Sequence, residues 1–315
     1  MYKLTNINQG KAAGLLGLSG MYGNISQYER NKSLTFILNN FELIDTATVY
    51  GVQYDLNEVL ANLADQISGE LPVLCNKIGA DLQECASFDE LRMEYETQRK
   101  KMRFFGRQII MLHRPKLELA ERDNHLYTYL KELHGNSLMF GLSTNSLGVI
   151  NHYLSIGIKI NFVQMAINFL DYKNNLNLLK RCKELSIQVH GRSVLASGIL
   201  SRVYEPFENV KFTDPLRRRY CDDQNKEILA ERLRKANEVH IIHQRYCESF
   251  DYIPKANFVY ELMQAMPNVD LVIRGGSCLS QFKENSYSIR PLESEFVKDF
   301  YDRQLMQLQA RYFNV

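Results

Sequence analysis

Four ionisable side chains in the first 113 residues have the types and the order needed for proton donation. Asp45 and Tyr50 stand five residues apart in the stretch IDTATVYG, and Lys77 and His113 follow, each at the end of a short apolar run. A tyrosine with a pKa of ~10 is a weak acid at neutral pH, and an adjacent ammonium lowers that pKa by stabilising the phenolate. A carboxylate keeps such a lysine charged, and a neutral histidine can hold a substrate oxygen. These four residues, called the tetrad below, therefore suit reduction of a carbonyl.

Short apolar runs recur between longer amphipathic stretches, a pattern typical of parallel strands that alternate with helices. Eight such runs lie at residues 12–18, 41–46, 73–77, 108–113, 138–143, 161–165, 187–192 and 269–274. They predict an α/β fold, a (β/α)8 TIM barrel that forms a single domain over residues 1–315. The active site of such a barrel forms at the carboxyl ends of its strands. Asp45, Lys77 and His113 fall at or just past these ends, which supports placing them in one site.

The segments between the runs contain helix candidates, among them residues 57–68, 175–185 and 224–249. A long polar segment, residues 201–223, follows the seventh run. It is either a lid or cofactor clasp at the catalytic face or an ordinary solvated loop. Residues 286–315 carry apolar side chains at mixed helical spacing, so we interpret this tail as a closing helix that packs against the barrel.

The stretch DTATVYG resembles the D-T-A-x-x-Y-G signature of the aldo-keto reductases, whose catalytic residues are Asp, Tyr, Lys and His in this order. The resemblance spans residues 12–285. It implies that Tyr50 is the general acid, that Lys77 and Asp45 adjust its pKa, and that His113 orients the carbonyl. Since side chains cannot supply a hydride, it also implies a nicotinamide cofactor. Each residue of the tetrad, considered alone, has an alternative structural role as a helix cap, a surface residue or a core residue.

Polar residues at the ends of the fifth and sixth runs match family segments that hold the nicotinamide amide. The stretch FGLSTN is similar to G-x-S-N-F, with Ser143 in place, Thr144 at the asparagine position and Asn145 one residue later. Gln164 matches the family glutamine that binds the same amide. An amide needs a donor and an acceptor, which serine and glutamine provide together. The alternative is that these residues merely finish two strands.

The seventh run leads into RSVLASGIL, which resembles the family segment Y-S-P-L-x-x-G-x-L, whose backbone wraps the pyrophosphate. The resemblance assigns Ser193, Leu195 and Gly198 to the cofactor, and small residues allow main-chain N–H groups to approach phosphate oxygens. The departure is Arg192, because the family usually has an aromatic ring there that stacks on the nicotinamide. A guanidinium plane can stack in its place or bind an anion instead.

The eighth run leads into IRGGSCLSQFKEN, which is similar to I-P-G-A-R-S-V-x-Q-L-x-E-N, with its last two residues at the adenine. The cofactor residues implied by this match are Arg274, Gly275, Gly276, Ser277, Gln281, Glu284 and Asn285. Three positions that carry a basic residue for the ribose 2′-phosphate in NADPH-selective members are not basic here. Arg274 remains nearby, and Arg217, Arg218 and Arg219 of the long segment are more distant candidates or simply a solvated face. The resemblance favours NADPH, with NADH as the open alternative.

Composition argues against several classes of partner and site. The 38 basic and 36 acidic residues give a net charge of +2, which produces no field to gather nucleic acid or an anionic membrane. No stretch reaches the ~18 apolar residues needed to cross a bilayer and the first residues lack a signal-peptide core, so a cytoplasmic protein is expected. The six cysteines are scattered without C-x-x-C spacing, so we expect reduced thiols and no metal site.

The leading hypothesis is an oxidoreductase that uses a reduced nicotinamide on a small-molecule aldehyde or ketone. The chain has no tryptophan, which favours a polar pocket for a sugar or a sugar-derived carbonyl. The rival hypothesis is a regulatory or scaffold protein that keeps the barrel and binds nucleotide with little turnover. Thr144, Arg192 and Gly275 favour the rival, whereas the complete tetrad opposes it. The sequence does not fix the substrate, the direction of the reaction or the oligomeric state.

Overall fold

Eight parallel strands form a closed barrel at the centre of the protein. The computed structural model describes residues 12–17, 25–51, 54–80, 87–171, 175–203, 225–287 and 291–304. The strands are β1 (Ala12–Gly17), β2 (Phe41–Ala47), β3 (Val73–Ile78), β4 (Gln108–His113), β5 (Phe140–Ser143), β6 (Phe162–Ala166), β7 (Gln188–Arg192) and β8 (Leu271–Gly275). Each strand pairs with the next, and β8 pairs with β1 to close the sheet. The predicted (β/α)8 barrel is confirmed.

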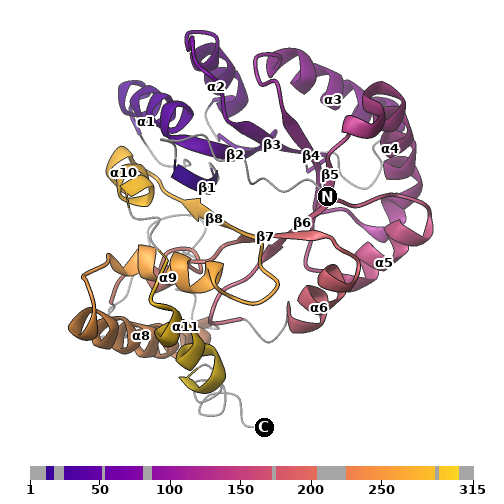
Figure 1. Cartoon of the computed structure of the whole chain (residues 1–315). Coiled ribbons are helices and arrows are strands. Elements are labelled where there is room, and N and C mark those ends of the chain that lie inside the picture. The colour runs from indigo at the N-terminus through magenta and orange to yellow at the C-terminus, as the bar shows by residue number, and fades with distance from the viewer. Residues whose placement is uncertain are drawn as a thin grey trace.

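Helices surround this barrel in chain order, as Figure 1 shows. They are α1 (Gln27–Asn40), α2 (Leu56–Ala64), α3 (Phe88–Lys101), α4 (Ala120–His134), α5 (Leu147–Ser155), α6 (Leu176–Glu184), α8 (Lys226–Ser249), α9 (Lys255–Gln264), α10 (Leu279–Tyr287) and α11 (Ser294–Asp299). Short 3-10 turns occur at Leu117–Leu119, Gly135–Ser137 and Ile199–Ser201. Helices α8, α9 and α11 group on one side of the barrel, where the Tyr246 and Phe296 rings lie 4.8 Å apart.

The predicted strands all appear, and each begins and ends within about two residues of its prediction. The three helix candidates also appear, as α2, α6 and α8. The tail is more broken than expected: α10 ends at Tyr287, Pro291 follows, and α11 leads into a π-helical turn at Phe300–Gln304. Proline disfavours helical backbone in the residue before it, which accounts for a break at this point. Residues 305–315, and all but the first three residues of the long segment 201–223, lie outside the described residues.

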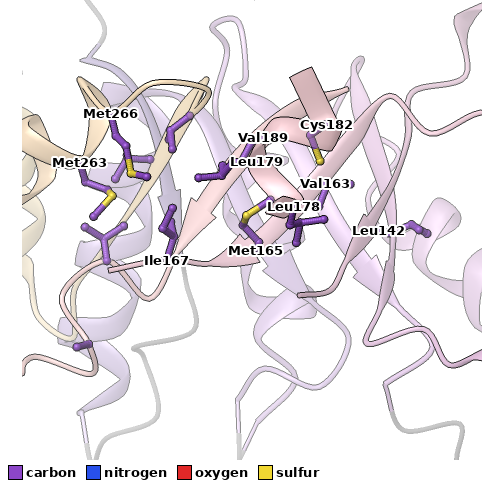
Figure 2. Packing of buried hydrophobic residues seen from close by; sticks show 14 of the residues in the cluster. Leu142, Val163, Met165, Ile167, Leu178, Leu179, Cys182, Val189, Met263 and Met266 are labelled. Carbon is purple, nitrogen blue, oxygen red and sulfur yellow. The ribbon is translucent and has the colours of Figure 1, made fainter. Parts of the chain in front are cut away.

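The pleat of each strand sends alternate side chains inward and outward. Leu43, Val73, Ile109, Phe162 and Ile273 belong to one cluster although they come from five different strands, so they fill the barrel interior. The residues between them face the helices. Figure 2 shows Val163, Met165 and Val189 of the barrel beside Leu178, Leu179 and Cys182 of α6. The same alternation determines which polar residues of each strand face the barrel interior.

A buried polar network fixes β2 and β3 against α2 and α3. Asn57 accepts a hydrogen bond from the Thr46 hydroxyl at 2.6 Å and donates to Gln98 at 2.9 Å and to Asn76 at 3.4 Å. Thr46 follows Asp45 and Asn76 precedes Lys77 along their strands. Because buried amides are costly when unpaired, this network holds β2 and β3 in one register against their helices.

Candidate active site

The predicted catalytic residues meet at the carboxyl end of the barrel. Asp45, Lys77 and His113 lie on β2, β3 and β4, and all three are buried. The Lys77 Nζ atom donates to the Asp45 Oδ2 atom at 2.5 Å. Asp45 and Lys77 share the inward parity of Leu43 and Val73, two and four residues earlier on their strands, so the pleat alone turns both toward the barrel axis.

Tyr50 reaches this group from the turn after β2. Its N–H donates to the Ala47 carbonyl at 3.1 Å, and Gly51 follows with φ at 94°. A Cβ atom at Gly51 would overlap the Tyr54 carbonyl oxygen, which explains why tyrosine is followed by glycine here. The Lys77 Nζ atom lies 5.0 Å from the centroid of the Tyr50 ring. The Tyr50 and His113 rings lie 6.2 Å apart, edge to face at 88°.

Burial and charge act in opposite directions on the tyrosine. Burial raises the pKa of Tyr50 above its ordinary value, Lys77 lowers it by charge and hydrogen bonding, and Asp45 raises it again. The lowering by Lys77 that the sequence suggests is present, but desolvation outweighs it, so the expectation of a lowered pKa is wrong as a net effect. Tyr50 is therefore protonated at neutral pH.

The lysine and the histidine have opposite charge states. Burial would lower the pKa of Lys77, but Asp45 and the other neighbours hold it above its ordinary value, so the ammonium persists. Burial lowers the pKa of His113 to about 3, and Lys77, Arg114 and Arg192 add to that lowering. His113 is therefore neutral at pH 7, as its proposed task of holding a substrate oxygen requires. Its Nδ1 atom is buried and has no hydrogen-bond partner within the described residues.

A glutamate on α3, which the sequence analysis did not single out, joins the two catalytic loops. Glu94 accepts a hydrogen bond from the Thr48 hydroxyl at 2.6 Å, two residues before Tyr50. Its carboxylate also accepts the N–H of Gly79, two residues after Lys77, at 3.1 and 3.2 Å. The Thr48 N–H donates to the Lys77 carbonyl at 3.1 Å. Glu94 therefore fixes the Tyr50 loop relative to the lysine strand.

The polar residues of β5 and β6 extend the tetrad into the barrel. Gln164 is fully buried, donates to the second Asp45 oxygen at 2.7 Å and accepts from the Ser143 hydroxyl at 3.3 Å. Asn145 bonds both the N–H and the carbonyl of Ala166 at 2.9 Å, which ties the end of β5 to the end of β6. Ser143 and Gln164 are thus brought to the catalytic centre, whereas Asn145 has a structural role at its rim.

The end of β7 carries Arg192 and a run of unusual backbone. Arg192 has the inward parity of Gln188 and His190 on the same strand, and its side chain donates to the Asn145 side-chain oxygen at 3.4 Å. After it, positive φ values occur at Ser193, Ala196, Ser197 and Gly198, between 49° and 86°. Leu195 lies inside this run, and its carbonyl accepts the N–H groups of Gly198 and Leu200. Left-handed backbone is costly for residues other than glycine, and clusters of it are frequent at ligand-binding segments.

The residues predicted around β8 separate into two groups. Arg274 follows the inward-facing Ile273, so its side chain points to the outer face of β8. There it is buried in an ion pair with Glu261 on α9, and its guanidinium carbon lies 5.2 Å from the centroid of the Tyr260 ring. This arrangement argues against the interpretation of Arg274 as a ligand of the cofactor phosphate. The physical reason is strand alternation, which sends its side chain to the helix layer.

The turn after β8 is held by its own side chains. The Asn285 amide donates to the Gly275 carbonyl at 3.1 Å, and Gln281 accepts the Ser277 N–H at 2.8 Å. At Gly276 a Cβ atom would lie 2.8 Å from the Phe282 ring, so glycine is needed for close packing. Asn285 is buried and anchors the strand end, whereas the predicted partner of the adenine beside it, Glu284, is exposed. Their assignment to the cofactor stays a prediction.

A second histidine lies within the barrel and was not anticipated. His190 of β7 is fully buried, its ring centroid lies 5.2 Å from that of Phe162, and both ring nitrogens lack a hydrogen-bond partner in the described structure. Burial lowers the pKa of His190 to about 4, Asp45 raises it and Lys77 lowers it further. His190 is therefore neutral and lies beneath the tetrad. The period-two pattern of β7 would have revealed it.

Comparison with known proteins agrees with this geometry. The model of the aldo/keto reductase family matches residues 12–302. The chain belongs to the aldo/keto reductase family. Its fold is similar to that of a glycerol dehydrogenase from Gluconobacter oxydans, with a TM-score of 0.70 and 17% identity over 95% of this chain and 91% of the other. It is also similar to an aldo/keto reductase from Brucella melitensis, with a TM-score of 0.61 and 14% identity over 94% of each chain. A search of curated proteins finds no match.

Membership of the aldo/keto reductase family supports an oxidoreductase that acts on small-molecule carbonyl compounds in general. Helices in the described part of this aldo/keto reductase are too short or too polar to cross a membrane. Within the same residues, no three His, Cys, Asp or Glu side chains are grouped to bind a metal ion.

Proposed function

We propose that this aldo/keto reductase reduces an aldehyde or ketone to an alcohol with NAD(P)H as the reductant and Tyr50 as the general acid. The observation that carries the proposal is the assembly of Tyr50, Lys77, Asp45 and His113 at the carboxyl mouth of the barrel, with the Lys77 ammonium 5.0 Å from the Tyr50 ring. Four residues that are up to 68 positions apart in the sequence meet in one site, as a shared reaction requires.

Each residue of the tetrad has a separable task. A nicotinamide held at this site would supply the hydride that reduces the carbonyl carbon. Tyr50 transfers its hydroxyl proton to the carbonyl oxygen, so the products are the alcohol and a tyrosinate that regains its proton from solvent. Lys77 stabilises that tyrosinate by its charge, while Asp45 keeps Lys77 charged and oriented. Neutral His113 donates a hydrogen bond to the carbonyl oxygen and polarises it without competing as an acid.

The residues after β7 fit the phosphates of a dinucleotide. Ser193 and Ser197 are exposed, and the left-handed backbone of this run has the character of loops that present main-chain N–H groups to anions. Ser143 and Gln164 are the proposed partners of the nicotinamide amide. They already bind each other and Asp45, which would couple the position of the nicotinamide to the catalytic carboxylate. We propose NADPH as the preferred form, with NADH also accepted.

The substrate pocket is proposed to be polar. The chain contains no tryptophan, and the mouth is lined by tetrad residues and arginines, not by an indole wall. A sugar or a sugar-derived carbonyl matches such a lining because its hydroxyl groups can replace the hydrogen bonds that it loses to water.

A conservative substitution tests the proposal. Tyr50→Phe removes one hydroxyl, so turnover with a panel of aldehydes and NADPH should fall about 100- to 10,000-fold while nucleotide binding, followed by nicotinamide fluorescence, stays within about twofold. Tyr54→Phe is the matched control, because Tyr54 lies in the same loop beneath the Arg30 guanidinium and outside the tetrad. Wild-type turnover by Tyr50→Phe would show that another group is the acid. Nucleotide binding by the native protein without turnover of any carbonyl would favour a regulatory role.

A further inference from the structure

The charges at the carboxyl mouth do not cancel. Lys77 is neutralised by Asp45 at 2.5 Å, which leaves the charges of Arg114 and Arg192 beside the catalytic residues. Several other arginines of the described structure have carboxylate partners. Arg99, Arg122, Arg232 and Arg274 pair with Glu96, Asp123, Asp171 and Glu261 respectively. Arg114 and Arg192 differ from these four arginines because they have no carboxylate partner within the described residues.

Arg192 is held in place but not neutralised. Its terminal NH2 group donates to the Asn145 side-chain oxygen at 3.4 Å, and that oxygen already accepts the Ala166 N–H at 2.9 Å. The Nε atom of Arg192 is buried and finds no acceptor within the described residues. An arginine has five N–H donors, and leaving a buried donor unmade is costly. Arg192 thus presents unused donors at the inward face of β7.

Arg114 completes the pair from the other side of the mouth. It follows His113 directly, has a φ of 58°, and its N–H donates to the Ser143 carbonyl at 3.1 Å. Its side chain is exposed and makes no ion pair or hydrogen bond with the described part of the chain. A left-handed backbone is unusual for arginine, and strain of this kind persists where a site needs a particular direction of the side chain.

Both arginines act on the space beside the reacting groups. After burial and Lys77, Arg114 and Arg192 each lower the pKa of His113. The Arg114 N–H binds the Ser143 carbonyl and the Arg192 side chain binds the Asn145 side chain, so both arginines are tied to the same end of β5. Burial lowers the pKa of Arg192, and the charge of Arg114 lowers it further. An anion between two like charges relieves that repulsion and is attracted by both. Clefts lined by one sign of charge also raise the local concentration of the opposite ion.

We infer that Arg114 and Arg192 form a subsite for an anionic group on the carbonyl substrate, a carboxylate or a phosphate. This inference rests on the proposed reductase function and makes it narrower. The substrate class is then an aldehyde or ketone that carries an acidic group, and a sugar-derived carbonyl with a phosphate or an acid group belongs to this class. Guanidinium groups suit both anions because their planar N–H forks match paired oxygens.

Matched substrates test the inference in the native enzyme. Succinic semialdehyde is compared with butanal, and glyceraldehyde 3-phosphate with glyceraldehyde, all at saturating NADPH. We expect kcat/KM to be at least about tenfold higher for the anionic member of one pair, and to fall as NaCl rises from 20 to 200 mM because salt screens exposed charges. The pair that shows the preference identifies carboxylate or phosphate as the group. Equal kcat/KM values within both pairs would overturn the inference.

Variants connect the preference to the two residues. Arg114→Met and Arg192→Met should each lower the anionic-to-neutral ratio of kcat/KM by about tenfold, while Arg192→Lys should recover part of it because the charge remains. Arg181→Met, on the surface of α6, is the matched control and should leave the ratio unchanged. If both methionine variants keep the ratio but weaken binding of the nucleotide, the arginines serve the cofactor and the inference fails.

A binding measurement separates this inference from the proposed function. Titration of inorganic phosphate by calorimetry, with nucleotide bound and without any carbonyl compound, should show one site that Arg114→Met and Arg192→Met both weaken by at least about tenfold. Phosphate binding that depends on both arginines, in a protein that turns over no carbonyl, would refute the reductase function and leave an anion site. Turnover of carbonyls without such binding would keep the reductase function and refute a phosphate subsite, and equal kcat/KM values for succinic semialdehyde and butanal would then refute a carboxylate subsite as well.

Discussion

The two sides of the barrel mouth differ in how far their polar and charged groups are paired. On the β2–β3 side the polar groups satisfy one another: Lys77 binds Asp45, and Gln164 of β6 binds the remaining oxygen of Asp45. On the β7 side, Arg192 lacks a carboxylate partner within the described residues and is followed by a run of left-handed backbone. The first side is ordered before anything binds. The second leaves charge and N–H groups for a ligand to satisfy.

This difference separates chemistry from recognition. A proton donor needs fixed neighbours, because its pKa depends steeply on distance and burial. A binding surface needs unused donors and charge, which cost free energy until a partner arrives. Family resemblance is accordingly strongest at residues 45–51 and weaker after β7, where Arg192 replaces an aromatic residue. Four substitutions, from the largest expected effect to the smallest, can break or sharpen this contrast.

Lys77→Met should have the largest effect, because it leaves the Asp45 carboxylate buried without its cation. Breaking a buried ion pair costs about 3–5 kcal/mol of stability, and loss of the tyrosinate partner should lower turnover at least ~100-fold. Urea unfolding and initial rates measure the two effects. Lys101→Met is the control, since the Lys101–Asp55 pair is partly exposed and should contribute less than about 1 kcal/mol. Equal losses in the two variants would mean that the tetrad side is not a special environment.

Arg274→Met should be nearly as destabilising but should not affect recognition. It leaves Glu261 buried and unpaired, at a cost of about 3 kcal/mol, and the added substitution Glu261→Leu should recover part of that loss. Native protein should prefer NADPH over NADH by less than about a thousandfold in Kd, or ~4 kcal/mol, and Arg274→Met should change this ratio by less than about twofold. A change above about tenfold would restore Arg274 as a phosphate ligand.

Glu94→Gln should weaken the connection between the Tyr50 loop and the Lys77 strand. The neutral amide weakens the hydrogen bonds from Thr48 and Gly79, so we expect a loss of about 1–2 kcal/mol in stability and about tenfold in kcat, with the Kd for nucleotide nearly unchanged. Glu96→Gln is the matched control on the same helix, because Glu96 bonds Tyr129 and Arg99 away from both catalytic loops. A kcat equal to that of the control would show that the Tyr50 loop needs no such clasp.

The free energy of unfolding should decrease at acidic pH because His113 and His190 are buried in their neutral form. The folded-state pKa values of His113 and His190, about 3 and about 4, lie below the unfolded value of ~6.5, so the unfolded chain binds more protons between these limits. The stabilising contribution of the neutral histidines is therefore fully present above pH 6.5. It decreases as the pH falls, by roughly 1–2 kcal/mol per histidine between pH 6.5 and 5. His190→Leu should remove one of these contributions in urea unfolding at the two pH values. An unchanged difference would mean that His190 titrates normally.

Much of the fold and the catalytic centre could be predicted from local patterns. The eight apolar runs became the eight strands, and Asp45, Lys77 and His113 lie at their carboxyl ends because parallel strands in a barrel share one direction. Gly51 illustrates why the signature is compact: the turn that presents Tyr50 needs a positive φ beside it. Such information lies within a few residues of the chain, so a single sequence contains it.

Roles that depend on which face a residue occupies were harder to predict. Arg192 and Arg274 both stand near the ends of strands, yet one faces inward and the other binds α9. Glu94 looks like any solvated glutamate on α3 until the loops that it joins are folded beside it. His190 has a lowered pKa because it is buried away from water and its imidazole has no hydrogen-bond partner in the described structure.

The sequence by itself determined the strand order, the barrel and the four residue types of the tetrad with their spacing, because hydrophobic periodicity and turn chemistry are local properties. Only the tertiary structure decided the protonation states and the free charges. It raised the pKa of Tyr50 despite the adjacent Lys77, and it placed Arg274 in a buried ion pair while it left Arg192 without a carboxylate partner in the described residues. Those outcomes depend on desolvation and on contacts between distant segments, which exist once the chain has closed around them.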